Sequence, residues 1–198
     1  DQAQLCAEYG DGTIVRGESS IPAFGKRIKR GFLSPAACSL FAEAKAAIGN
    51  ADLIVLGPGS LYTSVLPNLL VAGMVDTLKR APAPIIYVCN IMTQPGETDG
   101  LTASGHLEAL IQHMKCNIIN YIVVNNSGIP SDILQKYKEE GSFPVKVDKR
   151  AIEKLGIKVL EGKMLNHSNL ARHDSDALAR LIIHQAFLLK GNKLLGGR

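Results

Sequence analysis

The stretch Leu53-Ile54-Val55-Leu56-Gly57-Pro58-Gly59-Ser60 places a short apolar run directly before a loop of small and hydroxyl-bearing residues. The same order recurs at Ile85–Cys89, which is followed by the polar loop Asn90–Gly100. Short runs rich in Val, Ile and Leu are typical of strands buried on both faces of a parallel sheet. The sequence therefore predicts an α/β fold with a ligand cleft beyond the carboxyl ends of these strands.

Apolar runs and helical segments alternate along most of the chain. We expect strands at Leu53–Leu56, Ile85–Cys89, Ile119–Val124, Pro144–Val147 and Ile157–Leu160. We expect helices at about 35–48, after the Ser34-Pro35 capping pair, and near Pro67–Arg80, Thr102–Lys115, Ser131–Glu140, Lys149–Leu155 and Asp174–Leu189. This alternation predicts a doubly wound, mostly parallel sheet with helices on both faces.

The first 33 residues follow a different pattern. Leu5–Tyr9 and Thr13–Arg16 flank a glycine turn, and a basic strand follows at Arg27–Leu33. This predicts a small antiparallel β insertion over about 1–33, within one domain that spans 1–190 and ends in a flexible tail at 191–198. Because Asp1 is not methionine and a strand begins almost at once, we expect the chain to begin inside a larger protein.

Composition limits the classes of function. With 198 residues, 46% hydrophobic and 20% charged, the chain is long enough for one sizeable core. Its formal net charge of +4 suits an anionic ligand, but the basic residues are scattered, so we expect no nucleic-acid partner. No apolar stretch reaches 18 residues, so we expect no membrane span. The absence of a Cys-x-x-Cys pair predicts buried thiols and a cytoplasmic location, the cysteines being Cys6, Cys38, Cys89 and Cys116.

The loop after the first strand has the composition of an anion cradle. Gly57 and Gly59 remove side-chain bulk, so that backbone N–H groups can approach a phosphate. Ser60 and Thr63 add hydroxyl donors ahead of a helix. A tight strand-to-helix turn with capping hydroxyls fits the same residues, so both interpretations stay open.

Amide side chains follow two of the predicted strands. Asn90 lies at the end of one strand with Gln94 in the same loop, and Asn125 ends the next strand. A carboxamide offers a donor beside an acceptor, which matches the imide edge of uracil or the amide edge of guanine. The alternative for each asparagine is a helix cap or a turn.

The remaining polar candidates have equally simple alternatives. Glu97 or Asp99 could hold Mg²⁺ in front of a phosphate, with Asp99 the weak metal candidate, or could cap the next helix. Asp99-Gly100 could also form an ordinary turn. Tyr137 could stack on a base, or be a half-buried aromatic residue. Arg172 could grip a pyrophosphate with its guanidinium fork, or pair with Asp174 at the surface. The histidines show no metal-ligand spacing, and we assign them no catalysis.

Four longer motifs resemble one family of bacterial proteins, the gluconeogenesis factors. The motifs are Asp11-Gly12-Thr13-Ile14-Val15-Arg16-Gly17-Glu18-Ser19, the run Ala51–Ser64, the run Val88–Gly100 and Arg172-His173-Asp174. The resemblance covers most of the chain. Members of this family open with a Gly-rich strand, loop and helix and an acidic stretch, and this chain has neither before its first hairpin.

The resemblance implies a function that spacing alone does not give. It implies a cytoplasmic protein that binds UDP-N-acetylglucosamine and is needed for normal cell shape on gluconeogenic carbon sources. Tyr137 and Arg172 match positions that hold the nucleotide sugar, and Ser60, Thr63 and Asn90 match the shared loops.

The family is related to the phospho-L-lactate transferases, so two classes of function must be weighed. We favour a ligand-responsive regulator with an unidentified protein partner, because the loops lack an evident general base or nucleophile. The alternative is a transferase that moves a phosphate-bearing group from a nucleotide-activated donor. A structural adaptor is a third reading, and a homo-oligomer and a bound Mg²⁺ ion stay open.

Overall fold

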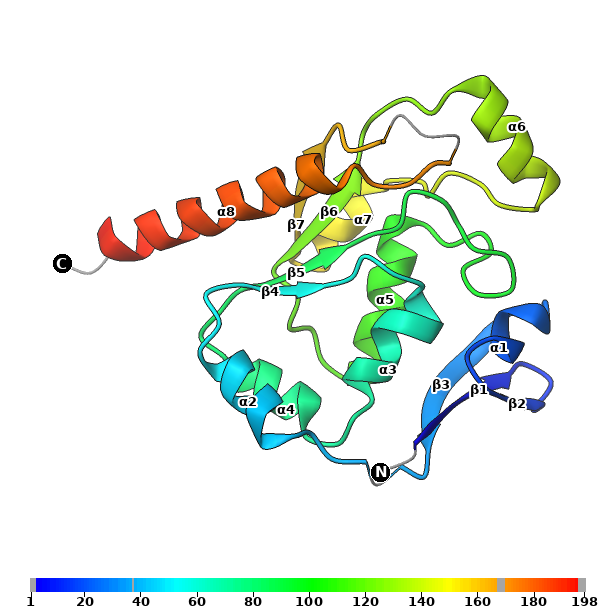
Figure 1. Ribbon diagram of the computed structural model, residues 1–198, viewed down its shortest axis with the longest axis horizontal. Helices are drawn as coiled ribbons and strands as arrows, with labels where there is room; N and C mark the ends of the chain where they lie inside the picture. The colour runs from blue at the N-terminus through cyan, green and yellow to red at the C-terminus, as the bar shows by residue number, and fades with distance from the viewer. Residues whose placement is uncertain (1–2, 37, 167–169, 196–198) are drawn as a thin grey trace.

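A parallel four-stranded sheet lies at the centre of the computed structural model, which describes residues 3–36, 38–166 and 170–195 (Figure 1). Its order is β4-β5-β6-β7, and the strands are β4 (Ile54–Leu56), β5 (Ile85–Val88), β6 (Tyr121–Asn125) and β7 (Lys158–Gly162). Leu56 pairs with Tyr87, and Val88 with Val123. The carboxyl ends of these strands therefore lie along one edge, as predicted.

Helices cover both faces of this sheet, which confirms the doubly wound α/β fold. Within β5, Ile85 and Tyr87 face one core, while Ile86 and Val88 face the other. The first core is closed by α3 (Leu66–Leu69), α4 (Met74–Arg80), α5 (Ala103–Met114) and α7 (Lys149–Lys154). The second is closed by α8 (Ser175–Leu195), which crosses the opposite face (Figure 1). Burial on both faces explains why β5 carries no charged residue.

The predicted antiparallel insertion is present at the start of the chain. It is a three-stranded sheet in the order β2-β1-β3, with β1 (Gln4–Tyr9), β2 (Ile14–Arg16), a short α1 (Ser20–Ala23) and β3 (Ile28–Ser34). It packs against α3 and α5, and His113 on α5 accepts a hydrogen bond from the backbone N–H of Gly31 on β3 at 3.0 Å.

The helix expected at 35–48 was wrong in its start. It begins only at Ala42 and runs to Gly49 as α2, because Ser34 is still part of β3 and pairs with Gln4. The segment that follows β3 is held in an extended bridge between Ser39 and Ala72. Strand pairing at Ser34 therefore overrides the local capping signal.

Two other expected elements also differ. The helix expected at 67–80 divides into α3 and α4, because Gly73 adopts a φ of +85° between them, and a π-helical turn η1 (Leu61–Val65) precedes α3. Residues 144–147 form no strand, and Pro144 makes only an isolated antiparallel bridge with Met92. Proline has no N–H to continue such a ladder.

The last helix extends beyond its expected end at Leu189. The last helix continues to Leu195, so residues 191–195 of the predicted tail are helical, while 196–198 lie outside the described residues. None of the helices in the described ranges is both long and apolar enough to cross a bilayer. Cys6, Cys38 and Cys89 are buried and form no disulfide, as predicted. Cys116 is also free, but it is partly exposed, where a buried thiol was predicted.

Candidate functional site

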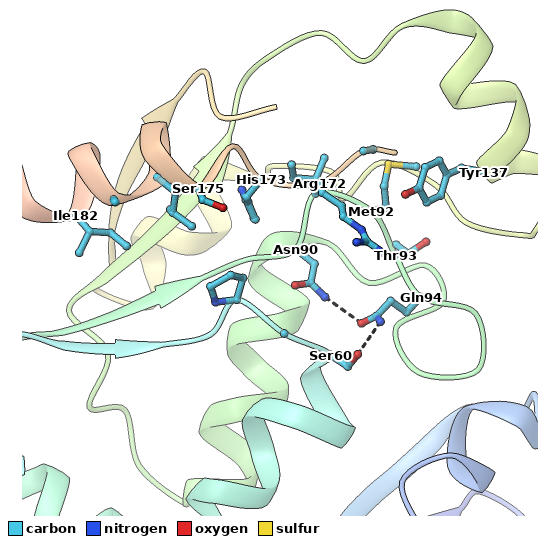
Figure 2. A pocket seen from close by; sticks show the side chains of 16 residues that line it. Ser60, Asn90, Met92, Thr93, Gln94, Tyr137, Arg172, His173, Ser175 and Ile182 are labelled. Atoms are coloured by element: carbon cyan, nitrogen blue, oxygen red, sulfur yellow. Dashed lines mark hydrogen bonds between the residues drawn. The ribbon is translucent and has the colours of Figure 1, made fainter. Parts of the chain in front are cut away.

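A cavity of about 820 Å³ lies beyond the carboxyl ends of β4 and β5 (Figure 2). We call it the cleft. Its walls come from the loops after these strands, from α6 (Ser131–Glu139) and from the start of α8. Six predicted site residues line it together, namely Gly59, Ser60, Asn90, Gln94, Tyr137 and Arg172. Three others, Gly57, Thr63 and Asn125, lie nearby but are not part of its wall.

The loop after β4 requires glycine for steric reasons. Gly57 has a φ of +85°, and a Cβ there would lie 3.2 Å from the carbonyl oxygen of Val88. A Cβ on Gly59 would lie 3.0 Å from the Cβ of Ser64, in the first turn of η1. Both glycines therefore let the loop fold tightly against β5 and η1, which brings Ser60 to the wall of the cleft.

A chain of side-chain hydrogen bonds joins the two loops across the floor of the cleft (Figure 2). Asn90 Nδ2 donates to Gln94 Oε1 at 3.0 Å, and Gln94 Nε2 donates to Ser60 Oγ at 2.7 Å. In this direction Ser60 accepts, so its own hydroxyl hydrogen is left for a ligand. Asn90 likewise keeps its carbonyl oxygen, which can accept from an imide N–H.

Arg172 carries the positive charge of the cleft. It is the one charged side chain among the described residues of the wall, and Figure 2 shows it pointing toward the loop that carries Thr93 and Gln94. Its expected surface partner is engaged elsewhere, because Asp174 Oδ1 accepts from the N–H of Ala177 at 2.8 Å in the first turn of α8. The guanidinium of Arg172 is exposed and placed to bind an anion.

Tyr137 closes one end of the cleft. The residue is half-buried and packs with Ile91, Met92 and Ile133 in a small apolar cluster, yet its side chain still lines the cavity (Figure 2). Stacking on a base and aromatic packing are therefore compatible here, because the cluster covers only part of the side chain.

Glu97 lies outside the cleft and holds η1 in place. One carboxylate oxygen accepts from the Thr63 hydroxyl at 2.9 Å and the other from the Tyr62 N–H at 3.1 Å. Burial raises the pKa of Glu97 above its usual range, and these two hydrogen bonds partly oppose that rise. Thr63 was predicted to donate to a bound anion, and in the structure its hydroxyl donates to the Glu97 carboxylate.

Asp99 and Asn125 are engaged in backbone contacts. Asp99 Oδ2 accepts from the N–H of Gly96 at 2.7 Å, which is the turn geometry weighed against the metal role. Asn125 Oδ1 accepts from the N–H of Met164 at 3.0 Å and thereby ties β6 to the segment after β7. Among the described residues, no group of three or more His, Cys, Asp or Glu side chains could hold a metal ion.

Sequence reasoning missed three polar residues of the cleft wall, Thr93, His173 and Ser175, and an apolar wall. His173 lines the cleft, its Nε2–H donates to the carbonyl of Cys89 at 3.1 Å, and burial lowers its pKa. Leu178 and Ile182 on α8 form the apolar wall. Their i, i+4 spacing marks one helix face, but only the packing of α8 across the sheet shows that this face meets the cleft.

Comparison with known proteins identifies the family. A family model described as "2-phospho-L-lactate transferase CofD" matches residues 1–165. The "Gluconeogenesis factor" of Bacillus subtilis (strain 168) is 46% identical over 180 residues, which cover 90% of this chain and 57% of that protein. The "Gluconeogenesis factor" of Halalkalibacterium halodurans is 45% identical over 180 residues, 90% of this chain and 56% of that protein.

A solved structure agrees with these relatives. The crystal structure of a member of the UPF0052 family from Bacillus halodurans superposes with a TM-score of 0.88 at 44% identity, over 91% of this chain and 58% of that chain. The chain thus spans just over half the length of the relatives that it matches. The match over residues 1–165 and these identities confirm the resemblance. The chain therefore belongs to the CofD family and is similar to the gluconeogenesis factors.

Proposed function

We propose that the cleft binds a nucleotide sugar, UDP-N-acetylglucosamine, and that the protein is a cytoplasmic, ligand-responsive regulator. Its role would be to support cell shape and growth on gluconeogenic carbon sources through an unidentified protein partner. Similarity to the gluconeogenesis factors supports the connection to gluconeogenesis.

The cleft's single positive charge carries this proposal. Arg172 is a planar cation that suits a diphosphate, and no Asp or Glu lies among the described residues of the wall to repel one. Tyr137 offers an aromatic face for the base, and the Asn90 carbonyl oxygen offers an acceptor for the N3–H of uracil. A volume of about 820 Å³ falls in the range of small-molecule sites, roughly 300–1,000 Å³.

The regulator interpretation rests on what the wall residues are engaged in. The described wall of the cleft holds no carboxylate, and Asp99 accepts from Gly96 in a turn of its own loop. The one imidazole in that wall, His173, donates from Nε2 to the carbonyl of Cys89, and its Nδ1 is buried. A general base normally lies within hydrogen-bond reach of the reacting group. A transferase remains the second candidate, because the matching family model describes a phospho-L-lactate transferase.

One experiment tests both candidates. Calorimetric titration of the full-length protein with UDP-N-acetylglucosamine, UDP and GDP should give tight binding of the uridine nucleotides and weaker binding of GDP. Mass spectrometry of the same mixtures with candidate acceptors should detect no transferred group. No binding of any uridine nucleotide would refute the proposal, and detection of a transferred group would favour the transferase.

A further inference from the structure

A second cavity of about 430 Å³ adjoins the cleft. We call it the side cavity. Ser60, Thr93, Gln94 and Tyr137 line both spaces, so the two meet at the side chains that form the floor and one end of the cleft. The far wall of the side cavity comes from other elements, namely the α1 region of the small sheet, the first turn of η1 and the end of α6.

The two cavities differ in charge. The described wall of the cleft carries Arg172 and no carboxylate, whereas that of the side cavity carries Glu18, Glu97 and Glu140 and neither lysine nor arginine. Glu97 is only 5% exposed and is held rigidly by Thr63 and Tyr62. Each of its oxygens accepts one hydrogen bond and keeps a second lone pair, so it can still accept from a ligand.

Hydroxyl groups complete the wall of the side cavity. Thr63, Ser19, Thr93, Ser142 and Tyr137 all contribute. Thr63 already donates its hydroxyl hydrogen to Glu97, and Ser142 donates its own to the carbonyl of Thr93, so Ser19, Thr93 and Tyr137 supply the hydroxyl donors and the carboxylates supply acceptors. Such a wall matches the alternating donors and acceptors of a polyol. It disfavours an anion, because three like charges would face it and like-charge contacts are costly in binding sites.

We infer that the side cavity holds the sugar of the nucleotide sugar and selects an uncharged, polyhydroxylated ring over an acidic one. This inference rests on the proposed function, since it places the diphosphate beside Arg172 and continues the ligand past Gln94 into the side cavity. It adds a substrate class: neutral hexose or hexosamine nucleotides bind, and uronate nucleotides are rejected.

A matched ligand pair tests this selection. UDP-glucose and UDP-glucuronate differ only in a hydroxymethyl group against a carboxylate. Titration of the full-length protein should give about tenfold tighter binding of UDP-glucose, as expected for like charges in a confined site. In Glu140→Lys the ratio of the affinity for UDP-glucose to that for UDP-glucuronate should fall close to one. In Glu140→Gln this ratio should lie between one and the wild-type value.

A neighbouring residue supplies the control. Glu139 is the last residue of α6, directly before Glu140. It is exposed, accepts a hydrogen bond from Gln135 and is not part of the side-cavity wall. Glu139→Lys changes the net charge equally and should keep the wild-type ratio. Equal wild-type affinity for both nucleotides, or equal effects of Glu139→Lys and Glu140→Lys, would overturn the inference while UDP binding still upholds the proposed function. If the protein binds neither UDP nor UDP-glucose, both the inference and the proposed function are overturned.

Discussion

A substitution of Arg172 can distinguish paired hydrogen bonds to a diphosphate from charge attraction alone. Arg172→Lys keeps the charge but loses the planar pair of donors, so binding of UDP-N-acetylglucosamine should weaken by about 1.5–3 kcal/mol, the range for hydrogen bonds to charged groups. Folding stability should barely change, because the side chain is exposed. Calorimetry measures the first and urea denaturation the second. Arg180→Lys, an exposed change on α8 outside the cleft wall, is the control, and equal affinities for both variants would remove Arg172 from the site.

Tyr137 should contribute through its aromatic face. Tyr137→Ala should weaken nucleotide-sugar binding by about 1–3 kcal/mol, the range for one base-aromatic stack. Since the side chain also packs on Ile133, the alanine variant loses some apolar packing as well. Tyr137→Phe keeps the ring but loses the hydroxyl that lines the side cavity, so its binding should weaken by clearly less than that of the alanine variant. If the phenylalanine variant binds as poorly as the alanine variant, stacking is not the cause.

The sequence could indicate which residue types approach the ligand, but not how they engage one another. Ser60, Asn90 and Gln94 were predicted separately, from loops 30 residues apart, and the structure joins them in one chain of hydrogen bonds. Asn125 carries the same chemistry as Asn90, yet its amide is used by the backbone of Met164. Only the tertiary structure distinguishes two asparagines that both end strands.

At the scale of elements, the loop after β5 is fixed by its contact with α1. Gly96 has a φ of +79°, and a Cβ there would lie 2.1 Å from the carbonyl oxygen of Pro22. Gly96→Ala therefore combines backbone strain of about 1–3 kcal/mol with a backbone collision and should lower the free energy of unfolding by more than that strain alone. Urea denaturation of the purified variant measures the loss.

Gly100 in the same loop provides the matched control. Its φ is +67°, but a Cβ there would meet nothing within 4 Å, so Gly100→Ala introduces strain without collision. We expect Gly100→Ala to cost roughly 1–2 kcal/mol, clearly less than Gly96→Ala. Equal losses at the two positions would show that the contact with Pro22 adds nothing to stability.

Local signals located most elements but missed those set by distant partners. Thr102 caps α5 by accepting from the N–H of Gly105, as its position in the sequence indicates. The start of α2 was misplaced because Ser34 pairs with Gln4, some 30 residues earlier. A capping residue carries no information about a strand that competes for its backbone.

At the scale of the whole molecule, His113 on α5 links this helix to β3 of the small sheet and should make that attachment depend on pH. Its Nδ1–H donates to the carbonyl of Ala109 at 2.6 Å, and its Nε2 accepts from Gly31 at 3.0 Å, so the ring must be neutral. Burial, with a smaller contribution from the charge of Arg30, lowers the pKa of His113. The unfolded chain then binds the proton more readily, so stability is full above a pH of about 6.5 and is lost as the pH falls below it.

His113→Gln removes this titration while keeping an acceptor for Gly31. Urea denaturation between about pH 5 and pH 8 should show a flatter loss of stability at low pH in this variant than in the wild type. His184→Gln, at an exposed position on α8, should leave the wild-type slope unchanged. A wild-type slope in His113→Gln would show that the link to β3 does not depend on protonation.

The loop after β5 touches both the cleft and the small sheet, because Gln94 bonds to Ser60 while Gly96 lies against Pro22. The loop therefore couples the cleft to the small sheet mechanically. A ligand that reduces the motion of the loop at the cleft should also reduce the motion of the small sheet. Nucleotide-sugar binding should slow amide hydrogen exchange in β1 and β3, which no ligand atom needs to touch. If exchange slows only in the cleft, the loop does not couple the two regions. The small sheet would then support the site without responding to bound ligand.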